Sequence, residues 1–265
     1  MKECSFIGKT LDFSKSLDID LVKKFVVFDE IPSTNIEAKE LAENGEGEGT
    51  VVLARIQKKG RGRFNRLWES PDGGVYLSII LRPDCPSDKA TLLSLLAAIA
   101  VSTSIASYGV SAKVKWPNDI RVNGKKIAGI LLESEAFGNS LKYVILGIGI
   151  NLNIDKNLLS AKVKSISTSL SEEIGTSINY HSFIKNLLFN LDEYYKLFLS
   201  KKYDRIIKEW KNQSDTLGRI VRITTSSEQI IGKVYDIDRS GFLIVILNSG
   251  KHKTITSGDC TYIEK

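Results

Sequence analysis

The pattern of hydrophobic and polar positions predicts mixed strands and helices over the first four fifths of the chain. Apolar or β-branched runs bounded by polar residues predict strands at 25–28, 50–56, 75–81 and 113–116. The stretch 143–150 is almost entirely apolar and predicts a central, buried strand. Apolar residues at helical spacing predict a long helix at 88–108, ended by Gly109, and further helices at 180–199 and 202–212.

Two local signals refine this pattern. Asn123-Gly124 separates two apolar runs, 120–122 and 125–132, and favours a β-hairpin with a type I′ turn. Thr34 with Glu37 three residues later is a capping-box pattern, which predicts a helix at 35–43. Ser33 and Thr34 would then lie at a helix start, where hydroxyls commonly cap the helix and can alternatively bind a polar ligand.

The pattern of apolar and polar residues changes from Thr216 onward. Short β-branched runs at 219–224, 229–237, 242–247 and 252–256 are separated by Ser, Gly and Asp. This spacing is typical of a small β-barrel of about fifty residues. We therefore expect two domains, 1–213 and 214–265.

Composition narrows the class of protein. A chain of 265 residues with 42% hydrophobic residues can build a substantial core. The net charge of +6 arises from 37 basic and 31 acidic residues, and it favours anionic ligands without requiring nucleic acid. No apolar leader and no run of 18 apolar residues is found, so we expect a protein that is neither exported nor membrane-spanning.

The cysteines and histidines argue against several kinds of site. Cys4, Cys85 and Cys260 are odd in number and lack CxxC spacing, which disfavours a disulfide framework or a zinc site and fits a reducing cytoplasm. His181 and His252 are the only histidines, in surroundings that suggest no catalytic triad. Catalysis, if present, should then depend on cations and backbone donors.

The most distinctive stretch is the basic loop at 60–68, Gly-Arg-Gly-Arg-Phe-Asn-Arg-Leu-Trp. Its glycines allow backbone N–H groups to converge on an oxyanion, and arginine binds phosphate or carboxylate in bidentate fashion. From this stretch alone, a phosphate-binding loop and a solvated basic turn are equally good interpretations. The basic residues, with no acidic residue before Glu69, are Arg55, Lys58, Lys59, Arg61, Arg63 and Arg66.

Common nucleotide-binding motifs do not explain this loop. Gly8-Lys9-Thr10 ends like a Walker A motif but lacks its first glycine, because position 3 is Glu3. Gly147-Ile148-Gly149 lacks the third glycine of a dinucleotide-binding fingerprint. A P-loop or Rossmann enzyme is therefore disfavoured.

Four motifs in order, together with the glycine-rich segment 147–151, resemble those of the biotin protein ligases. The resemblance extends from about residue 25 to the C-terminus. The motifs are Ser33-Thr34-Asn35, Gln57 to Trp68, Lys115-Trp116-Pro117-Asn118-Asp119-Ile120, and Lys126-Ile127-Ala128-Gly129-Ile130-Leu131-Leu132-Glu133, followed by Gly147-Ile148-Gly149-Ile150-Asn151.

This resemblance implies a fold and a reaction. The implied fold is α+β, with a mixed, largely antiparallel sheet and flanking helices as in class II synthetase-like ligases, plus a small C-terminal SH3-like β-barrel. Biotin would be activated by ATP and Mg²⁺ as biotinyl-5′-AMP and transferred to a lysine of a biotin carboxyl carrier protein, for example that of acetyl-CoA carboxylase. A cytoplasmic location and a possible homodimer through an exposed sheet edge are also implied.

The resemblance further assigns roles to individual residues. Lys126 resembles the catalytic lysine and Arg61 the loop arginine that covers the biotin-adenylate junction. Trp68 resembles an aromatic residue on the adenine side, although it could instead anchor the loop in the core. Expected biotin contacts are Ser33, Thr34, Asn35, Gln57, Gly60, Arg61, Lys126 and Gly129, and expected ATP or adenylate contacts are Arg63, Arg66, Trp68, Lys115, Asn118, Asp119 and Asn151, with Asp119 also a candidate Mg²⁺ ligand.

Two departures from the family pattern stand out. Asn65 replaces the glycine usual in this loop, and Asn tolerates the left-handed conformation better than other non-glycine residues. The N-terminal winged helix of bifunctional members has no counterpart in this sequence, so we expect a ligase-only protein without specific DNA binding.

Two other functions compete with this interpretation. A lipoate or octanoate protein ligase shares the fold and the adenylating logic, but the basic loop combined with the KWPND motif favours biotin. A non-catalytic nucleotide- or nucleic-acid-binding module would use the basic loop, but it would leave Ser33, Thr34 and Lys126 unexplained.

Overall fold

The computed structural model describes residues 5–6, 9–10 and 19–263, so Cys4 and Gly8 lie outside the described residues. Its main element is a seven-stranded mixed sheet in the order β3-β4-β5-β9-β8-β7-β6. The β3–β4 pair is parallel and the other pairs are antiparallel. The strands are β3 (Lys24–Ile31), β4 (Thr50–Gln57), β5 (Val75–Leu81), β6 (Lys113–Lys115), β7 (Asp119–Val122), β8 (Lys125–Phe137) and β9 (Ser140–Ile150), and a separate two-stranded sheet pairs β1 (Ser5–Phe6) with β2 (Lys9–Thr10).

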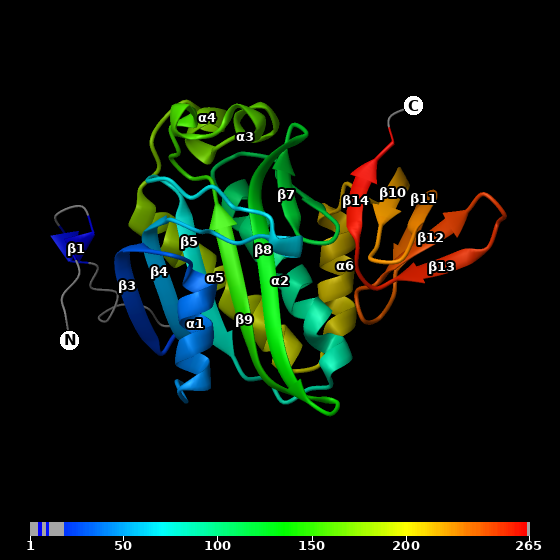
Figure 1. Cartoon of the computed structure of the whole chain (residues 1–265), viewed down its shortest axis with the longest axis horizontal. Helices are drawn as coiled ribbons and strands as arrows, with labels where there is room; N and C mark the ends of the chain where they lie inside the picture. Colours follow the sequence, from blue (N-terminus) through cyan, green and yellow to red (C-terminus); the bar gives the residue numbers. More distant parts are fainter. Residues whose placement is uncertain (1–4, 7–8, 11–18, 264–265) are drawn as a thin grey trace.

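Helices cover both faces of the seven-stranded sheet (Figure 1). Alternation along β4 shows the two layers, since Val51 and Leu53 belong to one buried cluster whereas Val52 and Ala54 belong to another. The smaller cluster packs against α1 (Thr34–Glu43). The larger one packs against α2 (Ala90–Ala106), α5 (Tyr180–Leu199) and α6 (Tyr203–Gln213).

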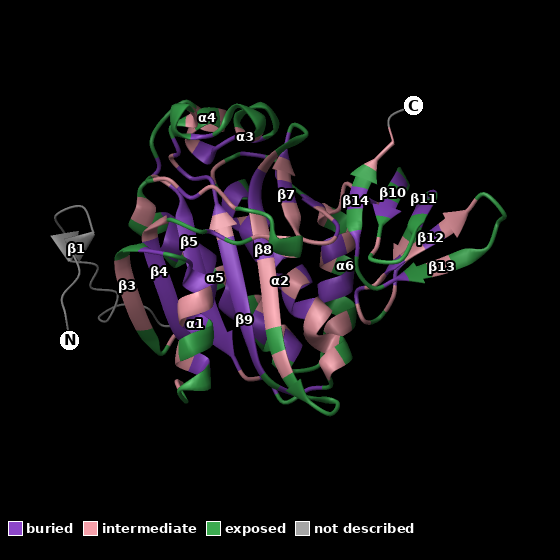
Figure 2. Cartoon of the chain, in the orientation of Figure 1, coloured by how far each residue is buried: buried purple, intermediate pink, exposed green. Residues whose placement is uncertain are grey.

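Helix α2 is the centre of the larger layer. The segment Ser87–Ala106 is long and apolar enough to cross a membrane, but 67% of its most apolar window is buried inside the protein. Figure 2 shows that β4, β5 and β9, in the middle of the sheet, are largely buried as well. This burial is typical of the core helix of a soluble domain.

A second sheet of five antiparallel strands follows α6, in the order β13-β12-β11-β10-β14. Figure 1 shows it beside α6, at the end of the molecule away from β3. The large mixed sheet with helices and this small β-domain confirm the predicted α+β fold. Its strands are β10 (Ile220–Thr224), β11 (Gln229–Ile237), β12 (Leu243–Leu247), β13 (His252–Ile255) and β14 (Asp259–Tyr262), of which only β14 was not predicted.

Most predicted elements are present, but some differ from the prediction; for example, β3 and β8 are longer than predicted. The predicted capping box is wrong, because Ser33 is the N-cap residue, no side chain caps α1, and the Thr34 hydroxyl bonds Gln57 instead. The helix at 88–108 begins as the 3₁₀ turn η2 (Ser87–Lys89) and ends at Ala106. The pattern did not predict α3 (Ala161–Ile166), α4 (Leu170–Ile174) or the short turns η1 (Arg63–Asn65) and η3 (Lys156–Leu158), because these elements have only three to six residues.

Candidate active site

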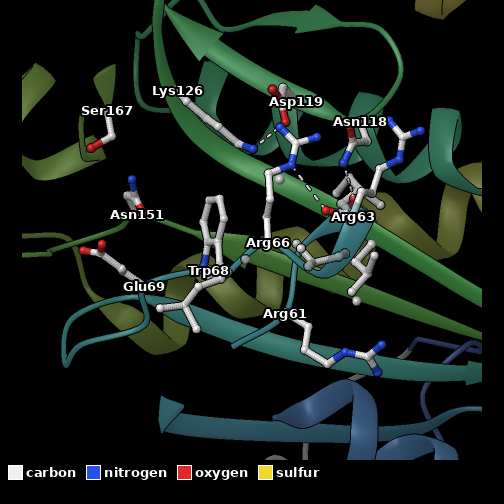
Figure 3. Close-up of a pocket in the computed structure, with 18 of the residues that line it drawn as sticks. Arg61, Arg63, Arg66, Trp68, Glu69, Asn118, Asp119, Lys126, Asn151 and Ser167 are labelled. Atoms are coloured by element: carbon white, nitrogen blue, oxygen red, sulfur yellow. Dashed lines mark hydrogen bonds and ion pairs between the residues drawn. The ribbon is translucent and has the colours of Figure 1, made fainter. Parts of the chain in front are cut away.

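A cleft of about 240 Å³ lies where β4 and β9 end and β8 begins, beside the loop that follows β4 (Figure 3). It gathers every site residue predicted from the sequence except Gly60. Gly60 is buried, and its carbonyl accepts a hydrogen bond from the backbone N–H of Trp68 at 2.9 Å. The predicted residues that line the cleft are Ser33, Thr34, Asn35, Gln57, Arg61, Arg63, Arg66, Trp68, Lys115, Asn118, Asp119, Lys126, Gly129 and Asn151.

One end of the cleft is a buried network of uncharged polar groups. Gln57 Oε1 accepts hydrogen bonds from the Thr34 backbone N–H at 2.8 Å and from the Thr34 hydroxyl at 3.2 Å. The Ser78 hydroxyl lies 2.8 Å from Thr34 Oγ1 and 2.7 Å from Asn35 Oδ1. Because buried polar groups with fixed partners keep one geometry, this end suits a neutral ligand that both donates and accepts hydrogen bonds.

Two glycines of β9 let side chains lie flat on the sheet at this point. A Cβ at Gly147 would lie 1.9 Å from Asn35 Oδ1, and one at Gly149 would lie 2.6 Å from Trp68 Nε1. The motif 147–149 therefore serves close packing rather than dinucleotide binding.

Trp68 forms part of the wall of the cleft. Its ring lies against Gly129 and Gly149, with Lys126 Nζ 5.0 Å from the ring centroid. Its indole Nε1 is buried and has no hydrogen-bond partner among the described residues. A buried donor without a partner is costly, and here the nitrogen is packed against Gly149.

Lys126 and Asp119 form an ion pair in the wall of the cleft. The two come from adjacent strands, β8 and β7, and Lys126 Nζ lies 2.5 Å from Asp119 Oδ1. Both side chains are roughly one-quarter to one-third exposed, at 31% and 24%. The lysine charge is therefore already compensated within the protein, and an anionic ligand would compete with Asp119 for it.

The three loop arginines point to different partners. Arg61 Nη1 lies 3.1 Å from Glu133 Oε1, and Figure 3 shows its side chain directed away from Lys126. Arg63 bonds Asn118 Oδ1 at 3.4 Å, and burial lowers the pKa of its guanidinium. Arg66 forms an ion pair with Asp259 at 3.0 Å.

The loop reverses direction through two left-handed residues. Asn65 has φ +57°, as expected of the residue that replaces glycine, but Phe64 also has φ +55°. A left-handed aromatic residue is uncommon and strained. The guanidinium carbons of Arg63 and Arg66 lie 4.8 and 5.6 Å from the Phe64 ring centroid, and these cation–π contacts help to offset that strain.

Other predicted residues are held by local bonds. The Asn118 side chain donates to Ile130 O at 2.7 Å, and the Asn151 side chain donates to Thr168 O at 2.9 Å. Both thus fix the shape of the cleft walls. Lys115 Nζ lies 5.2 Å from the Tyr262 ring centroid, at the border with the C-terminal sheet.

Several residues in and around the cleft carry little signal in the sequence and were not predicted. Ser78 carries a hydroxyl within the otherwise largely apolar strand 75–81. A polar residue at such a position was the one feature of the sequence that could have indicated its role. Glu133 is the last residue of the motif 126–133, but the sequence does not show that it pairs with Arg61. The cleft-lining residues contributed by segments far from the motifs are Leu159, Val163, Ile166, Ser167, Asp259 and Cys260.

The cleft offers limited means of holding a metal by protein groups alone. Among the described residues, no group of three or more His, Cys, Asp or Glu side chains could coordinate an ion. Mg²⁺ needs only one or two carboxylates when phosphates supply further oxygens, so Asp119 fits a nucleotide-bound Mg²⁺.

Comparisons with known proteins agree with this geometry. Residues 27–151 match the biotin/lipoate A/B protein ligase family, and residues 216–261 match the biotin protein ligase C-terminal domain. The chain is 39% identical to the bifunctional ligase/repressor BirA of Bacillus subtilis, over 86% of this chain and 71% of that protein. It is 33% identical to biotin--[acetyl-CoA-carboxylase] ligase of Paracoccus denitrificans, over 80% of this chain and 90% of the relative.

A solved structure is similar over nearly the whole chain. Biotin protein ligase from Aquifex aeolicus in complex with biotin and ATP matches 92% of this chain and 100% of its own, with a TM-score of 0.76 and 28% identity. The similarity covers both the mixed sheet and the C-terminal sheet, since the aligned share leaves few residues out.

Proposed function

Because the chain belongs to the biotin protein ligase family, we propose that it activates biotin with ATP and transfers the biotinyl group to a carrier protein. The observation that carries this proposal is the continuity of the cleft. Its uncharged polar end, around Thr34 and Gln57, meets an end rich in cations around Lys126. A ligand with a neutral hydrogen-bonding head and an anionic tail matches both ends.

The first step joins two anions. A biotin carboxylate oxygen attacks the α-phosphorus of ATP, the bond to the bridging oxygen breaks, and pyrophosphate leaves. Lys126 is positioned to offset the charge that accumulates between the reactants, once it exchanges Asp119 for the ligand. Arg63, which bonds Asn118 next to Asp119, adds positive charge on this side of the cleft.

The second step transfers the acyl group. A lysine amine of the carrier attacks the carbonyl of biotinyl-5′-AMP, the C–O bond to phosphate breaks, AMP leaves, and the amine loses its proton to solvent. For this step the cleft must hold the adenylate until the carrier arrives. The loop at 60–68 provides the cover, since it lies over the cleft and places Trp68 in its wall.

Mg²⁺ would be held by Asp119 together with the ATP phosphates, where it would neutralise phosphate charge. We assign the biotin contacts to the polar network of Ser33, Thr34, Asn35 and Gln57, with Ser78 supporting it from β5. Trp68 and Asn151 would contact the adenylate. The position of the Trp68 ring, 5.0 Å from Lys126 Nζ, supports the assignment of Trp68.

The decisive assay combines ATP, Mg²⁺, biotin and a biotin carboxyl carrier domain, with lipoate as a competing substrate. We expect biotin-dependent release of pyrophosphate and a mass increase of the carrier that corresponds to one biotinyl group. Labelling by lipoate instead would support the lipoate ligase alternative. Binding of DNA or nucleotide with no biotin-dependent chemistry would support a non-catalytic module.

Further proposals concern the setting of the enzyme. We propose a catalytic unit at 1–213 and a C-terminal β-domain at 214–265, a cytoplasmic location, and acetyl-CoA carboxylase as the source of the carrier. A homodimer would pair an exposed sheet edge such as β3, whose residues are largely exposed or half-buried, and sedimentation would test it.

A further inference from the structure

The C-terminal sheet reaches into the cleft through the turn that precedes β14. Arg63 Nη1 donates a hydrogen bond to the Gly258 carbonyl at 3.1 Å. Arg66 binds the Asp259 carboxylate through both terminal nitrogens, at 3.3 and 3.0 Å. The basic loop is thus bonded to residues that lie more than 190 positions further along the chain.

The bonds of Arg66 leave it poorly placed to bind phosphate. Its Nε donates to the Arg63 carbonyl at 3.3 Å, so three of its five N–H groups are bonded to protein. The carboxylate of Asp259 occupies the bidentate position that a phosphate would need. This arrangement is typical of an anchor, although the sequence predicted a phosphate contact.

The segment before this sheet and the turn between β11 and β12 also hold Trp116, which lines the cleft. The Trp116 backbone N–H donates to Thr216 Oγ1 at 2.9 Å, and its indole donates to Gly241 O at 3.4 Å. Trp116 is only 1% exposed, so these bonds are shielded from water. The segment 115–119 and the loop 60–68 are therefore held on one common frame.

We propose that Gly258 and Asp259 form a clasp that positions the basic loop over the cleft, with Asp259 acting through Arg66 and not on the substrate. This role rests on the proposed biotin ligase function, because the consequence of loop position is retention of biotinyl-5′-AMP. Exposed ion pairs contribute little to overall stability, and the Arg66–Asp259 side chains are 57% and 52% exposed. Breaking this ion pair should therefore leave the overall stability of the protein nearly unchanged.

Exchanging the charges of Arg66 and Asp259 tests whether Arg66 anchors the loop or binds phosphate. Arg66→Asp and Asp259→Arg should each speed dissociation of biotinyl-5′-AMP by about threefold to tenfold, because each breaks the ion pair. The double variant Arg66→Asp/Asp259→Arg restores the pair and should return dissociation to within about twofold of wild type. A double variant as defective as Arg66→Asp alone would overturn the clasp, since Arg66 would then be needed for its own charge at the ligand.

Asp259→Asn tests the carboxylate with a smaller change, and Glu228→Gln is its matched control. Glu228 also forms an exposed ion pair on the C-terminal sheet, with Lys253 at 2.6 Å. We expect Asp259→Asn to raise the adenylate dissociation rate at unchanged melting temperature, and Glu228→Gln to leave both unchanged. Equal dissociation rates for Asp259→Asn and wild type would also contradict the clasp.

Hydrogen exchange keeps this test independent of the enzymatic activity. In the ligand-free protein, backbone amides of residues 60–68 should exchange faster in Asp259→Asn than in wild type or Glu228→Gln. If wild type formed no biotinyl-5′-AMP, the proposed function would fail while this measurement still decided the clasp. Unchanged exchange in Asp259→Asn would refute the clasp even if the enzyme were fully active.

Discussion

At the scale of single residues, we expect the largest loss of reaction rate from substitution of Lys126. Its side chain lines the cleft, and its ammonium group is paired with Asp119 at 2.5 Å. We predict that Lys126→Ala lowers the rate of biotinyl-5′-AMP formation by about 10² to 10³, typical of losing one group that stabilises transition-state charge. Biotin binding should change far less, as measured by calorimetry beside pyrophosphate release. Near-normal pyrophosphate release in this variant would remove Lys126 from the catalytic role.

We expect Arg61 to slow the dissociation of biotinyl-5′-AMP from the cleft. Its ion pair with Glu133, which also accepts a hydrogen bond from Asn35 at 2.8 Å, places it beside the polar end of the cleft. We predict that Arg61→Ala releases biotinyl-5′-AMP faster, so that lysines of bystander proteins become labelled. The dissociation rate and labelling of serum albumin measure this effect, and an unchanged dissociation rate would contradict it.

Substitutions at Asn65 test whether the loop needs a left-handed residue at this position. With φ at +57°, Asn65→Gly should keep activity within about twofold, because glycine adopts this conformation without strain. Asn65→Val should weaken ATP binding, because a β-branched residue in this region costs on the order of 1–2 kcal/mol and the loop would relax. Steady-state kinetics with varied ATP compares the two variants. Equal KM values would show that the left-handed turn is not needed.

At the scale of secondary-structure elements, β9 depends on glycine where side chains of other elements cross it. A Cβ at Gly147 would lie 1.9 Å from Asn35 Oδ1, so Gly147→Ala must displace a buried, hydrogen-bonded side chain. We predict a loss of about 1–3 kcal/mol in the free energy of unfolding and a KM for biotin raised about tenfold or more. Gly47→Ala is the control, because a Cβ there meets nothing within 4 Å. Similar behaviour of the two variants would contradict the proposed contact.

At the scale of the whole molecule, the C-terminal sheet makes stability dependent on pH. The pKa of the Cys260 thiol is raised to about 11, and burial is the largest cause. The unfolded thiol ionises near pH 8.5 to 9, so the folded state holds a proton that the unfolded state has lost. The stabilising contribution is therefore complete below pH 8.5 and is lost as pH rises toward 11.

Comparison with Cys260→Ala isolates this contribution. The difference in unfolding free energy between wild type and Cys260→Ala should fall by up to about 3 kcal/mol between pH 8.5 and 11. Denaturant unfolding at several pH values measures it. A difference that stays constant over this range would show that the thiol is not protected by the fold.

Local patterns along the chain determine much of the fold. The apolar run 75–81 predicts the bounds of β5, and Asn123-Gly124 predicts the hairpin turn, where the two residues have φ values of +49° and +81°. These features depend on neighbours in sequence, so periodicity and turn preference suffice to predict them. The short helices α3 and α4 were missed because helices of five or six residues depend on packing rather than on propensity.

The motifs by themselves predicted 14 residues that line the cleft, and Gly60 is the one predicted site residue that does not line it. What the tertiary structure alone decided is the partner of each charge: Glu133 for Arg61, Asp119 for Lys126 and Asp259 for Arg66. Each pair joins different loops or strands, and the last joins the basic loop to the C-terminal sheet. A charged residue shows its sign in the sequence, but its partner depends on distances that exist only once the chain has folded.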